Sequence, residues 1–415
     1  MRIRSITCFF DPRASSTYAA LDHLGKLAST ARDLFTKAGF EVQTTRLATT
    51  PFPLLYPTEE VENAVRLAQA LESDAKQRGF DYVSLGPALP SHPESYKLII
   101  PILKATQNVF LTGFMTHPRS GADRHTEISL TAVRACAEII AQAATLTPDG
   151  FGNLRFAALA NVAPNAPFFP AAFHQGSRMG FSLAIECADS AYSAVRKART
   201  LAEARQNIIN TLEASATNLS SGSNYIAQQF DAEFRGIDFS LAPFPEPWCS
   251  LGATLEALGL PALGRSGSLA AAAFLADSLD RGSWLRAGFN GLMMPVLEDS
   301  TLAGRTADGT YGVHDLLMYS AVCGTGLDTV PLPGDSTPEQ IGALLLDVAA
   351  LALRLNKPLT ARLMPIPGKK AGDPTSFDFA YFANGTVLSL PAAPLTGLLA
   401  GSEGISILPR GGYSA

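Results

Sequence analysis

The sequence has little charge for its length. Of its 415 residues 17% are charged and 47% are hydrophobic, so much of the chain must be buried in a packed core. Its 32 Lys and Arg are scattered rather than gathered on one stripe, and the net charge is −5. A nucleic-acid-binding surface needs a basic patch. We therefore expect no nucleic-acid partner.

Cysteine is scarce, and long hydrophobic runs are missing. The five cysteines stand far apart without a CxxC pair, which argues against a disulfide framework and indicates buried thiols in a reducing compartment. The Ala/Leu-rich runs 267–276 and 342–355 are too short to span a bilayer. The short apolar N-terminal run predicts a first strand rather than a signal peptide. We expect a cytoplasmic protein with no membrane partner.

Standard nucleotide and hydrolase motifs are also missing. No GxGxxG follows the first predicted strand, and no lysine follows the glycine pairs as in a P-loop. The string GRSGS at 264–268 lacks the spacing of a GxSxG elbow. The sequence therefore gives no support for nucleotide binding through a standard motif.

What is present is an alternation of short apolar runs with amphipathic stretches. This alternation favours parallel strands joined by helices, in one α/β domain over residues 1–415. The predicted strands are 2–9, 41–46, 81–86, 108–114, 155–161, 181–187, 236–242, 289–297, 359–365, 376–382 and 386–390. The predicted helices are 16–38, one beginning after Glu59, 94–106, 126–145, 189–214, 249–258, 268–280, 312–322 and 338–354. Residues 323–336 are predicted to form a compact loop.

The segment 161–174 is the first candidate for function, because it follows a buried strand, where α/β proteins place functional loops. Its amides Asn161 and Asn165 can orient a polar substrate, and Phe168 can exclude water. His174 can transfer a proton near neutral pH. The alternative is structural: the two asparagines are turn residues, and His174 is a hydrogen-bonded histidine at a helix start.

Cys323 is the second candidate. It precedes a glycine-rich turn, C-G-T-G-L-D, which also brings Asp328 within five residues. A thiol on a tight turn can act as a nucleophile, although most free cysteines are simply buried. A divalent cation is a further candidate ligand if acidic side chains converge at the strand ends. The acids considered are Asp11, Asp238, Glu298, Asp299 and Asp328.

Four strings resemble a single protein family. They are NAPFFPAAFH at 165–174, GIDFSLAPFPEPWCSLGATLEALGL at 236–260, MYSAVCGTGLDTVPLPGDSTPEQI at 318–341 and LPRGG at 408–412. The family is the domain of unknown function seven hundred eleven, also called pyruvate formate-lyase-like. The resemblance runs over nearly the whole chain.

The resemblance implies a closed ten-stranded α/β barrel of the pyruvate formate-lyase-like type, with a loop inserted in its lumen. In that fold an inserted cysteine faces a C-terminal glycine, which makes Cys323, Gly411 and Gly412 the candidates here. The string Arg410-Gly411-Gly412-Tyr413 is similar to the Arg-x-x-Gly-Tyr of glycyl-radical enzymes, but it is one residue shorter. Cys323 also has no second cysteine beside it.

The sequence therefore predicts an enzyme that acts on a small, carboxylate-bearing metabolite inside a barrel. Cys323 would be the reactive thiol and His174 the acid/base, while Arg46 and Arg410 would bind the carboxylate. The other predicted substrate-binding residues are Asn161, Asn165, Phe168, Asp328, Gly411 and Gly412. One alternative is a metabolite-binding or regulatory protein on the same scaffold, and a less favoured one is a glycyl-radical enzyme. Surplus apolar helix faces predict a homo-oligomer.

Overall fold

A computed structural model describes residues 1–13, 17–55, 60–117 and 126–410. Nine of its strands form one mixed sheet in the order β8-β7-β1-β2-β3-β4-β6-β10-β9. The strands of this sheet are β1 (Arg2–Phe10), β2 (Val42–Thr49), β3 (Tyr82–Ala88), β4 (Val109–Phe114), β6 (Phe156–Ala160), β7 (Gly180–Glu186), β8 (Glu233–Asp238), β9 (Gly326–Pro333) and β10 (Leu359–Ile366). Two further strands, β5 (Thr126–Ser129) and β11 (Gly404–Ile407), pair separately with each other.

The sheet consists of two groups of strands that run in opposite directions. Strands β1, β2, β3, β4 and β6 are parallel neighbours. Strand β7 is antiparallel to β1, and β10 is antiparallel to β6. Each of these carries a parallel partner, β8 and β9 respectively. The N-terminal ends of β1, β2, β3, β4 and β6 therefore lie at the same end of the sheet as the C-terminal ends of β7 and β10.

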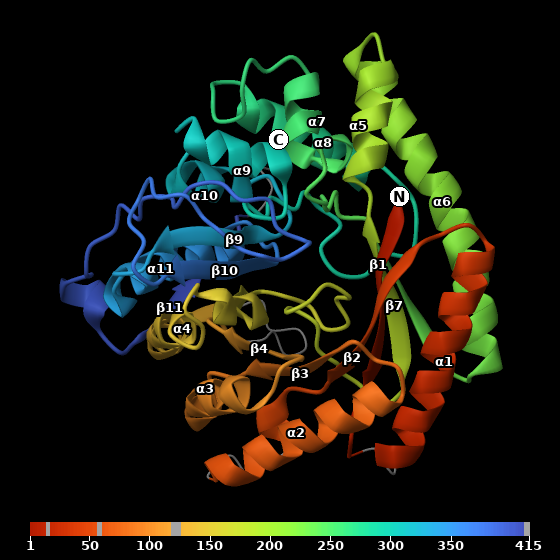
Figure 1. Ribbon diagram of the computed structural model, residues 1–415, viewed down its shortest axis with the longest axis horizontal. Coiled ribbons are helices and arrows are strands. Elements are labelled where there is room, and N and C mark those ends of the chain that lie inside the picture. Colours follow the sequence, from red (N-terminus) through yellow and green to blue (C-terminus); the bar gives the residue numbers. More distant parts are fainter. Residues whose placement is uncertain (14–16, 56–59, 118–125, 411–415) are drawn as a thin grey trace.

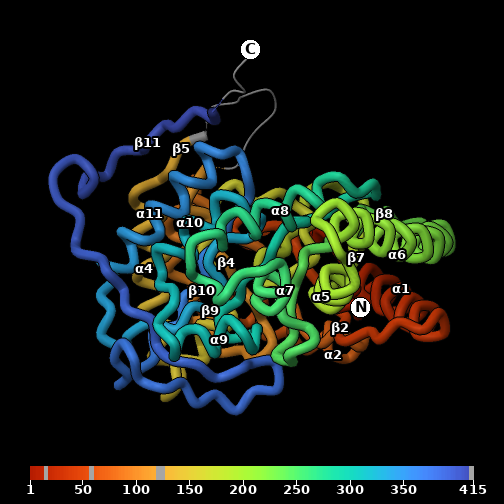
Figure 2. The backbone as a smooth tube through the Cα atoms, turned by 90° about the horizontal axis from the view of Figure 1, so that it is seen from above, coloured from red at the N-terminus to blue at the C-terminus, as the bar shows by residue number. Residues whose placement is uncertain are grey.

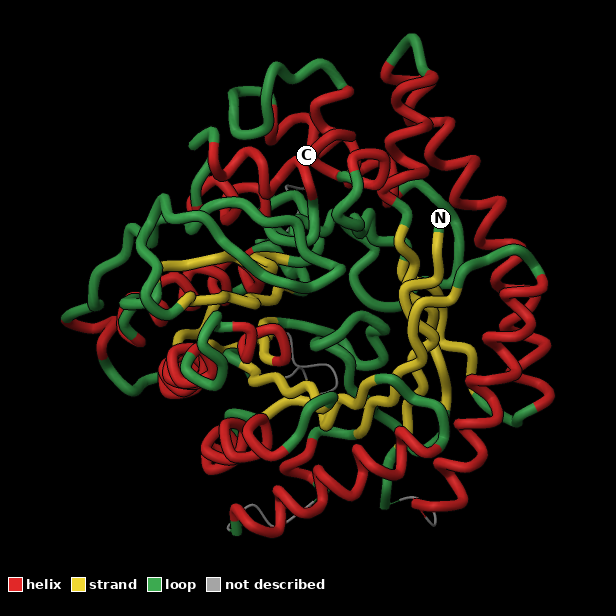
Figure 3. The backbone as a smooth tube through the Cα atoms, in the orientation of Figure 1, coloured by secondary structure: helices red, strands yellow, loops and turns green. Residues whose placement is uncertain are grey.

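Helices cover the outer face of the sheet. In Figures 1 and 3 the strands curve around central loop segments, and helices such as α1, α2 and α3 lie outside the curve. The α-helices of the described residues are α1 (Thr17–Lys37), α2 (Val61–Gln77), α3 (Tyr96–Ala105), α4 (Leu130–Ala144), α5 (Ala188–Lys197), α6 (Leu201–Gln229), α7 (Leu251–Ala257), α8 (Ser268–Asp280), α9 (Ser300–Ala307), α10 (Val313–Ser320) and α11 (Pro338–Arg354).

Strand β1 shows how side-chain alternation separates the two faces of the sheet. Its residues Ile6 and Cys8 are fully buried in the main core formed with the helices. The intervening Ser5 and Thr7 are also fully buried, but they donate hydrogen bonds to the carbonyl of Pro167, which belongs to the loop between β6 and β7. Small polar side chains thus face the interior loop, and apolar ones face the helices.

The segment 286–296 lies between the two edge strands, β8 and β9. Isolated parallel bridges join it to β8 at Ile237, to Leu241 just after β8, and to β9 at Asp328. In the described residues it forms no regular strand, so the hydrogen-bonded sheet has nine members. Irregular backbone here is stabilised by Asp238, whose carboxylate accepts hydrogen bonds from the amides of Phe289 and Asn290.

Two glycines permit this segment to lie close to its neighbours. A Cβ on Gly236 would lie 2.6 Å from the carbonyl oxygen of Leu285, and Gly236 has a φ of 120°. A Cβ on Gly291 would lie 2.5 Å from the Cα of Gly324, in the turn before β9. Any larger side chain at these positions would push the segment away from β8 or β9.

Several predicted elements differ from the structure, among them the predicted strand 289–297, which forms only isolated bridges. Strand β9 was predicted as a loop because of Gly326, Pro331 and Pro333, but an edge strand tolerates proline because one side needs no donors. The predicted strands 376–382 and 386–390 are not strands; the aromatic rings of the first pack together around Phe151 instead. The predicted helix 189–214 is two helices, α5 and α6, because Thr200 caps α6.

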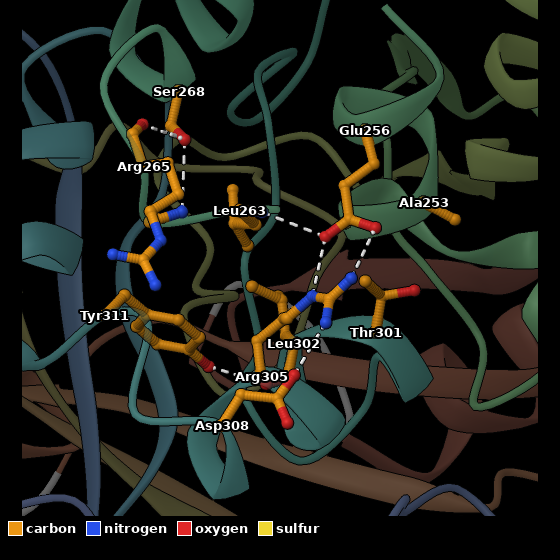
Figure 4. Close-up of polar contacts among 12 residues, drawn as sticks. Ala253, Glu256, Leu263, Arg265, Ser268, Thr301, Leu302, Arg305, Asp308 and Tyr311 are labelled. Atoms are coloured by element: carbon orange, nitrogen blue, oxygen red, sulfur yellow. Dashed lines mark hydrogen bonds and ion pairs between the residues drawn. The ribbon is translucent and has the colours of Figure 1, made fainter. Parts of the chain in front are cut away.

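Helices α7 and α9 are joined by a cluster of ion pairs and hydrogen bonds, shown in Figure 4. Arg305 donates to both carboxylate oxygens of Glu256, at 2.7 and 3.0 Å, and a third nitrogen reaches Asp308 at 2.6 Å. Glu256 also accepts from the amide of Leu263 at 2.9 Å. We call Glu256, Arg305 and Asp308 the helix-layer cluster.

The C-terminal segment after β10 runs along the outside of the molecule, as the blue tube in Figure 2 shows. The amide of Leu388 donates to β9 at Pro331, and the carbonyls of Ala400 and Gly401 accept from Arg134 of α4. No helix among the described residues is both long and apolar enough to cross a membrane.

Candidate functional site

The loop between β6 and β7 lies against the inner face of the parallel strands β1, β2, β3, β4 and β6. The carbonyl of Pro167 accepts a hydrogen bond from Thr7 at 2.8 Å, and the carbonyl of Ala172 accepts one from Ser84 of β3 at 2.6 Å. The ring of Phe169 packs edge-on against Phe110 of β4. Side chains from three strands therefore fix this loop in one position.

Asn161 and Asn165 shape this loop. Both have left-handed backbone conformations, with φ of 56° and 64°, which asparagine tolerates better than most residues. The amide of Asn165 donates to Phe173 across the loop at 2.7 Å. Both asparagines lie in turns, and neither is among the residues that line the two cavities described below.

A cavity of about 100 Å³, which we call cavity 1, lies where β1 to β4 begin. Its walls come from those strands, from the interior loop, from the 286–296 segment and from β9 and β10. The charged lining residues are Arg4, Arg46, Glu298, Asp328 and Arg362. The aromatic ones are Tyr82, Phe110, Phe168, Phe169, Phe289, Phe379 and Tyr381. Such a mixture of apolar walls and a few charges is typical of small-molecule sites.

Arg46 is the unusual charge of cavity 1. It is 8% exposed, yet it makes no ion pair with any described carboxylate. Its Nε donates to the hydroxyl of Thr44 at 2.9 Å, and its guanidinium lies 5.2 Å from the ring centre of Phe169 and 5.7 Å from that of Tyr82. Burial and then the neighbouring Arg4 lower its pKa to about 9, so it remains positively charged at neutral pH.

The other charges of cavity 1 form a continuous chain of ion pairs. Arg4 contacts Glu186 at 3.3 Å and Glu298 at 2.9 Å. Arg362 contacts Glu298 at 2.8 Å and Asp328 at 2.6 Å. Burial opposes the charge on Arg362, but its two carboxylate partners raise its pKa. Burial raises the pKa of Asp328, which Arg362 opposes.

Three of the residues predicted from sequence therefore meet in cavity 1: Arg46, Phe168 and Asp328. The sequence analysis did not select Arg4, Arg362, Tyr82 or Tyr381, although a signal was present. Arg4 and Arg362 interrupt strands that are otherwise apolar, and arginine is seldom fully buried without a partner. A search for charged residues inside buried strands would therefore have identified Arg4 and Arg362.

Cys323 does not line this cavity. It is 2% exposed and belongs to the main core, at the end of α10. Its backbone carbonyl accepts from the ammonium of Lys357, and its amide donates to Tyr319 at 2.8 Å. The expected void shared by Cys323 and His174 is not present in the described structure, because Cys323 packs into the core and His174 lines a separate cavity.

The predicted contribution of the C-terminus is also not found. Arg410 is exposed, lies outside cavity 1, and its amide donates to the carbonyl of Arg354 at the end of α11. The β11–β5 pairing keeps this segment on the outer surface. Gly411 and Gly412 lie outside the described residues.

The five acids considered for a cation do not gather at one place, although Glu298 and Asp328 both line cavity 1 and share Arg362. No group of three or more metal-binding side chains occurs within the described ranges. Asp299 accepts from the amides of Leu251, Gly252, Thr301 and Leu302, and so caps the start of two helices. Asp238 fixes the 286–296 segment, and Asp11 pairs with Arg13. The fold uses these carboxylates to satisfy backbone amides and an arginine.

His174 lines a second cavity, which we call cavity 2, of about 460 Å³. Its walls include Asp11, Thr50, Leu89 and Phe114, which lie at or just after the ends of β1, β2, β3 and β4. Cavity 1 touches the beginnings of the same strands. The two cavities therefore lie at opposite ends of the parallel group.

Comparison with known proteins identifies the family. A family model described as "Uncharacterised ACR (DUF711)" matches residues 1–381. The chain belongs to this family. The motif-based resemblance is thereby confirmed, whereas the likeness to the pyruvate formate-lyase barrel is not addressed by the match. The matched region contains every described residue of both cavities.

The family has relatives in distant organisms. A UPF0210 protein of Pyrobaculum arsenaticum is 32% identical over 386 residues, covering 87% of this chain and 83% of the relative. One from Actinobacillus succinogenes is 26% identical over 387 residues, covering 90% and 84%. One from Clostridium perfringens is 27% identical, covering 85% and 80%. These names state no activity, so function must be argued from the site.

Proposed function

We propose that this protein binds a small carboxylate-bearing metabolite in cavity 1, with Arg46 as the residue that holds the carboxylate. The observation that carries the proposal is a buried, positively charged guanidinium without a carboxylate partner. A buried charge costs much free energy unless it is paired, and a planar guanidinium matches a carboxylate with two parallel hydrogen bonds.

The shape of cavity 1 indicates the rest of the ligand. Aromatic side chains surround Arg46, and Tyr82 and Phe169 contact its guanidinium. An apolar or planar body would displace water from these rings, whereas a highly charged one would meet Glu298 and Asp328. The preferred ligand is therefore a monocarboxylate with an apolar body, for which benzoate is a suitable probe and acetate a matched, smaller one.

We also infer that the 286–296 segment completes a ten-stranded ring around this site. The support is its pairing with β8 at one edge and with β9 at the other, and the two glycines that permit close approach. Such a ring would enclose the interior loop, as in the barrel that the family resemblance implies. Enclosure strengthens ion pairing with a ligand because it excludes water.

The enzyme hypothesis assigns proton transfer to Asp328. This carboxylic acid lines cavity 1, and burial raises its pKa, which favours a group that can take up and release a proton. None of the five cysteines and none of the described histidines lines cavity 1. We therefore propose an acid/base reaction without a thiol nucleophile in that cavity. Binding without turnover, as in a regulatory protein, is the second candidate function for the same site.

Calorimetric titration with benzoate tests the binding proposal. Removing a charge-assisted pair should lower affinity about 10- to 100-fold in Arg46→Met. Arg305→Met, which removes a guanidinium from the helix-layer cluster, should bind benzoate as the wild type does. Equal affinity of the wild type and Arg46→Met would contradict the proposal.

Turnover separates the enzyme from the binding protein. Purified protein is incubated with a mixture of metabolic carboxylic acids, and mass spectrometry records which are consumed and which are only retained. The enzyme hypothesis expects Asp328→Asn to retain a ligand that the wild type consumes. Retention without consumption by the wild type favours the binding protein.

A further inference from the structure

Cavity 2 contains two buried polar atoms without partners. Nε2 of His174 and Oγ1 of Thr50 are both inaccessible to solvent and form no hydrogen bond in the described structure. Both residues line cavity 2, and their side chains come from different segments, the interior loop and the end of β2. Buried polar groups are nearly always hydrogen-bonded. Two unpartnered polar atoms at one cavity therefore indicate that a ligand supplies their hydrogen-bond partners.

The hydrogen bonds of His174 fix which of its nitrogens is free. Nδ1 lies 3.3 Å from Oδ1 of Asn165, and a carbonyl oxygen can only accept, so Nδ1 carries the hydrogen. Burial, followed by the nearby Arg235, lowers the pKa of His174 to about 4 against the opposing effect of the Gly176 backbone, so the ring holds one hydrogen at neutral pH. Nε2 is therefore a bare acceptor, and it requires a donor from whatever occupies cavity 2.

The remaining walls narrow the chemistry of the occupant. Asp11 and Arg13 form an ion pair at 2.7 Å, so this pair offers both acceptors and donors without a net charge. Leu89, Phe114 and Phe173 supply apolar surface against which the carbon face of a ring can lie. Cavity 2, of about 460 Å³, has the size of a small-molecule site and is large enough for a ligand of monosaccharide size.

We propose that cavity 2 is a second binding site, for a neutral polyhydroxylated molecule of the monosaccharide or cyclitol class. A hydroxyl donates to Nε2 of His174 and a neighbouring hydroxyl pairs with Oγ1 of Thr50, while Asp11 and Arg13 take further hydroxyls. A hydroxyl meets both needs because it donates and accepts. An anion is disfavoured because a bare Nε2 and the carboxylate of Asp11 would repel it.

The site is independent of cavity 1. Its residues lie at the ends of strands β1 to β4, whereas those of cavity 1 lie at their beginnings, and the two share no lining residue. The proposal therefore does not rest on Arg46 or on a carboxylate ligand. Failure of one site leaves the other untouched.

Nitrogen NMR of histidine-labelled, full-length protein tests the proposal, with D-ribose, D-glucose and myo-inositol as separate probes. A His174→Gln spectrum assigns the His174 signals among the six histidines. We expect the unprotonated Nε2 signal of His174 to move in a saturable way with at least one probe. No saturable shift with any of the three overturns the proposal.

Thr50→Val supplies the matched variant, because it removes one hydroxyl and keeps the shape of the side chain. Loss of one hydrogen bond should weaken the binding of the responding probe about tenfold. Arg46→Met should leave this binding unchanged, and Thr50→Val should leave benzoate binding unchanged. A probe that binds wild type and Thr50→Val equally contradicts the assignment of Thr50 and of cavity 2.

Discussion

Cavity 1 and the helix-layer cluster differ in how their buried or half-buried arginines are paired. In the cluster, Arg305 donates to Glu256 through two nitrogens and to Asp308 through a third. In cavity 1, Arg46 is more deeply buried and has only the hydroxyl of Thr44 and two aromatic rings. The first arrangement is complete within the protein, and the second is complete only with a ligand.

This comparison shows how a functional charge can be told from a structural one. A pair such as Arg305 and Glu256 holds two helices together, and its side chains are about a quarter exposed, which limits its contribution to stability. An unpaired charge such as Arg46 lowers stability and is retained for another reason. The predictions below test this difference, beginning with the largest expected effect.

Breaking the ion-pair chain of cavity 1 should have the largest effect on stability. Glu298→Gln removes the negative charge between Arg4 and Arg362, both of which it contacts within 3 Å. Leaving buried charges partly unpaired should lower the free energy of unfolding by about 3 kcal/mol. Urea denaturation measures this, with Glu256→Gln of the cluster as the control. A larger loss in Glu256→Gln would reverse the comparison.

Removing the two contrasted arginines should change stability in opposite directions. Arg305→Met should lower the free energy of unfolding by about 1–2 kcal/mol, because it leaves Glu256 and Asp308 without their partner. Arg46→Met should raise it by about 1 kcal/mol, because an unpaired buried charge is lost. Urea denaturation of Arg305→Met and Arg46→Met measures both changes in the free energy of unfolding. A loss of stability in both variants would mean that Arg46 is a structural residue.

The dependence of stability on pH should distinguish cavity 2 from the ion-pair chain of cavity 1 and from the helix-layer cluster. The pKa of His174 is about 4 in the folded protein and near its ordinary 6.5 in the unfolded chain, because burial and Arg235 oppose its charge while Asp11 and Glu233 favour it. Between these values the unfolded chain binds more protons, so stability should fall as the pH decreases from 6.5 towards 4.

The expected loss from His174 is roughly 1–3 kcal/mol over that interval. Measuring the free energy of unfolding at each pH for the wild type and for His174→Gln isolates this contribution, because other titrating groups are common to both. Parallel curves for the two proteins would show that His174 takes up its proton equally in the folded and unfolded states.

The smallest effect should come from the edge of the helix-layer cluster. Ser268 donates to the carbonyl of Arg265 at 2.7 Å and accepts from the amide of Gly264 at 3.0 Å (Figure 4). Ser268→Ala should lower the free energy of unfolding by about 1 kcal/mol, because it removes the hydrogen bonds of a buried hydroxyl. Benzoate and monosaccharide binding should not change. A change in either would connect this layer to the cavities.

Local patterns predicted most of the sheet. Strands such as 2–9, 108–114 and 359–365 were found because buried strands are continuous apolar runs between turn signals. The same patterns failed at β9, whose prolines are tolerated only because it lies at the sheet edge. They also failed at 376–382, where aromatic residues that favour strands pack against Phe151 instead. Both failures depend on neighbours distant in sequence.

The residues of the candidate site were likewise predicted only in part from local sequence patterns. Arg46, Phe168 and Asp328 were selected from sequence and line one cavity, because polar residues next to buried strands are uncommon and informative. Cys323, Asn161 and Arg410 were selected by equally reasonable local arguments and lie elsewhere. A residue's type and its flanking turn do not specify which side of a strand or turn faces the cavity.

The sequence by itself determined the family, the α/β class and the strongly buried character of the chain, because these depend on composition, periodicity and motif strings. Tertiary structure alone decided which charges are paired, since Glu298 and Arg4 are 294 residues apart and meet only after folding. It also decided that Arg46 and His174 face different cavities. Side-chain partnership depends on three-dimensional neighbours, and those neighbours are what distinguish a binding residue from a structural one.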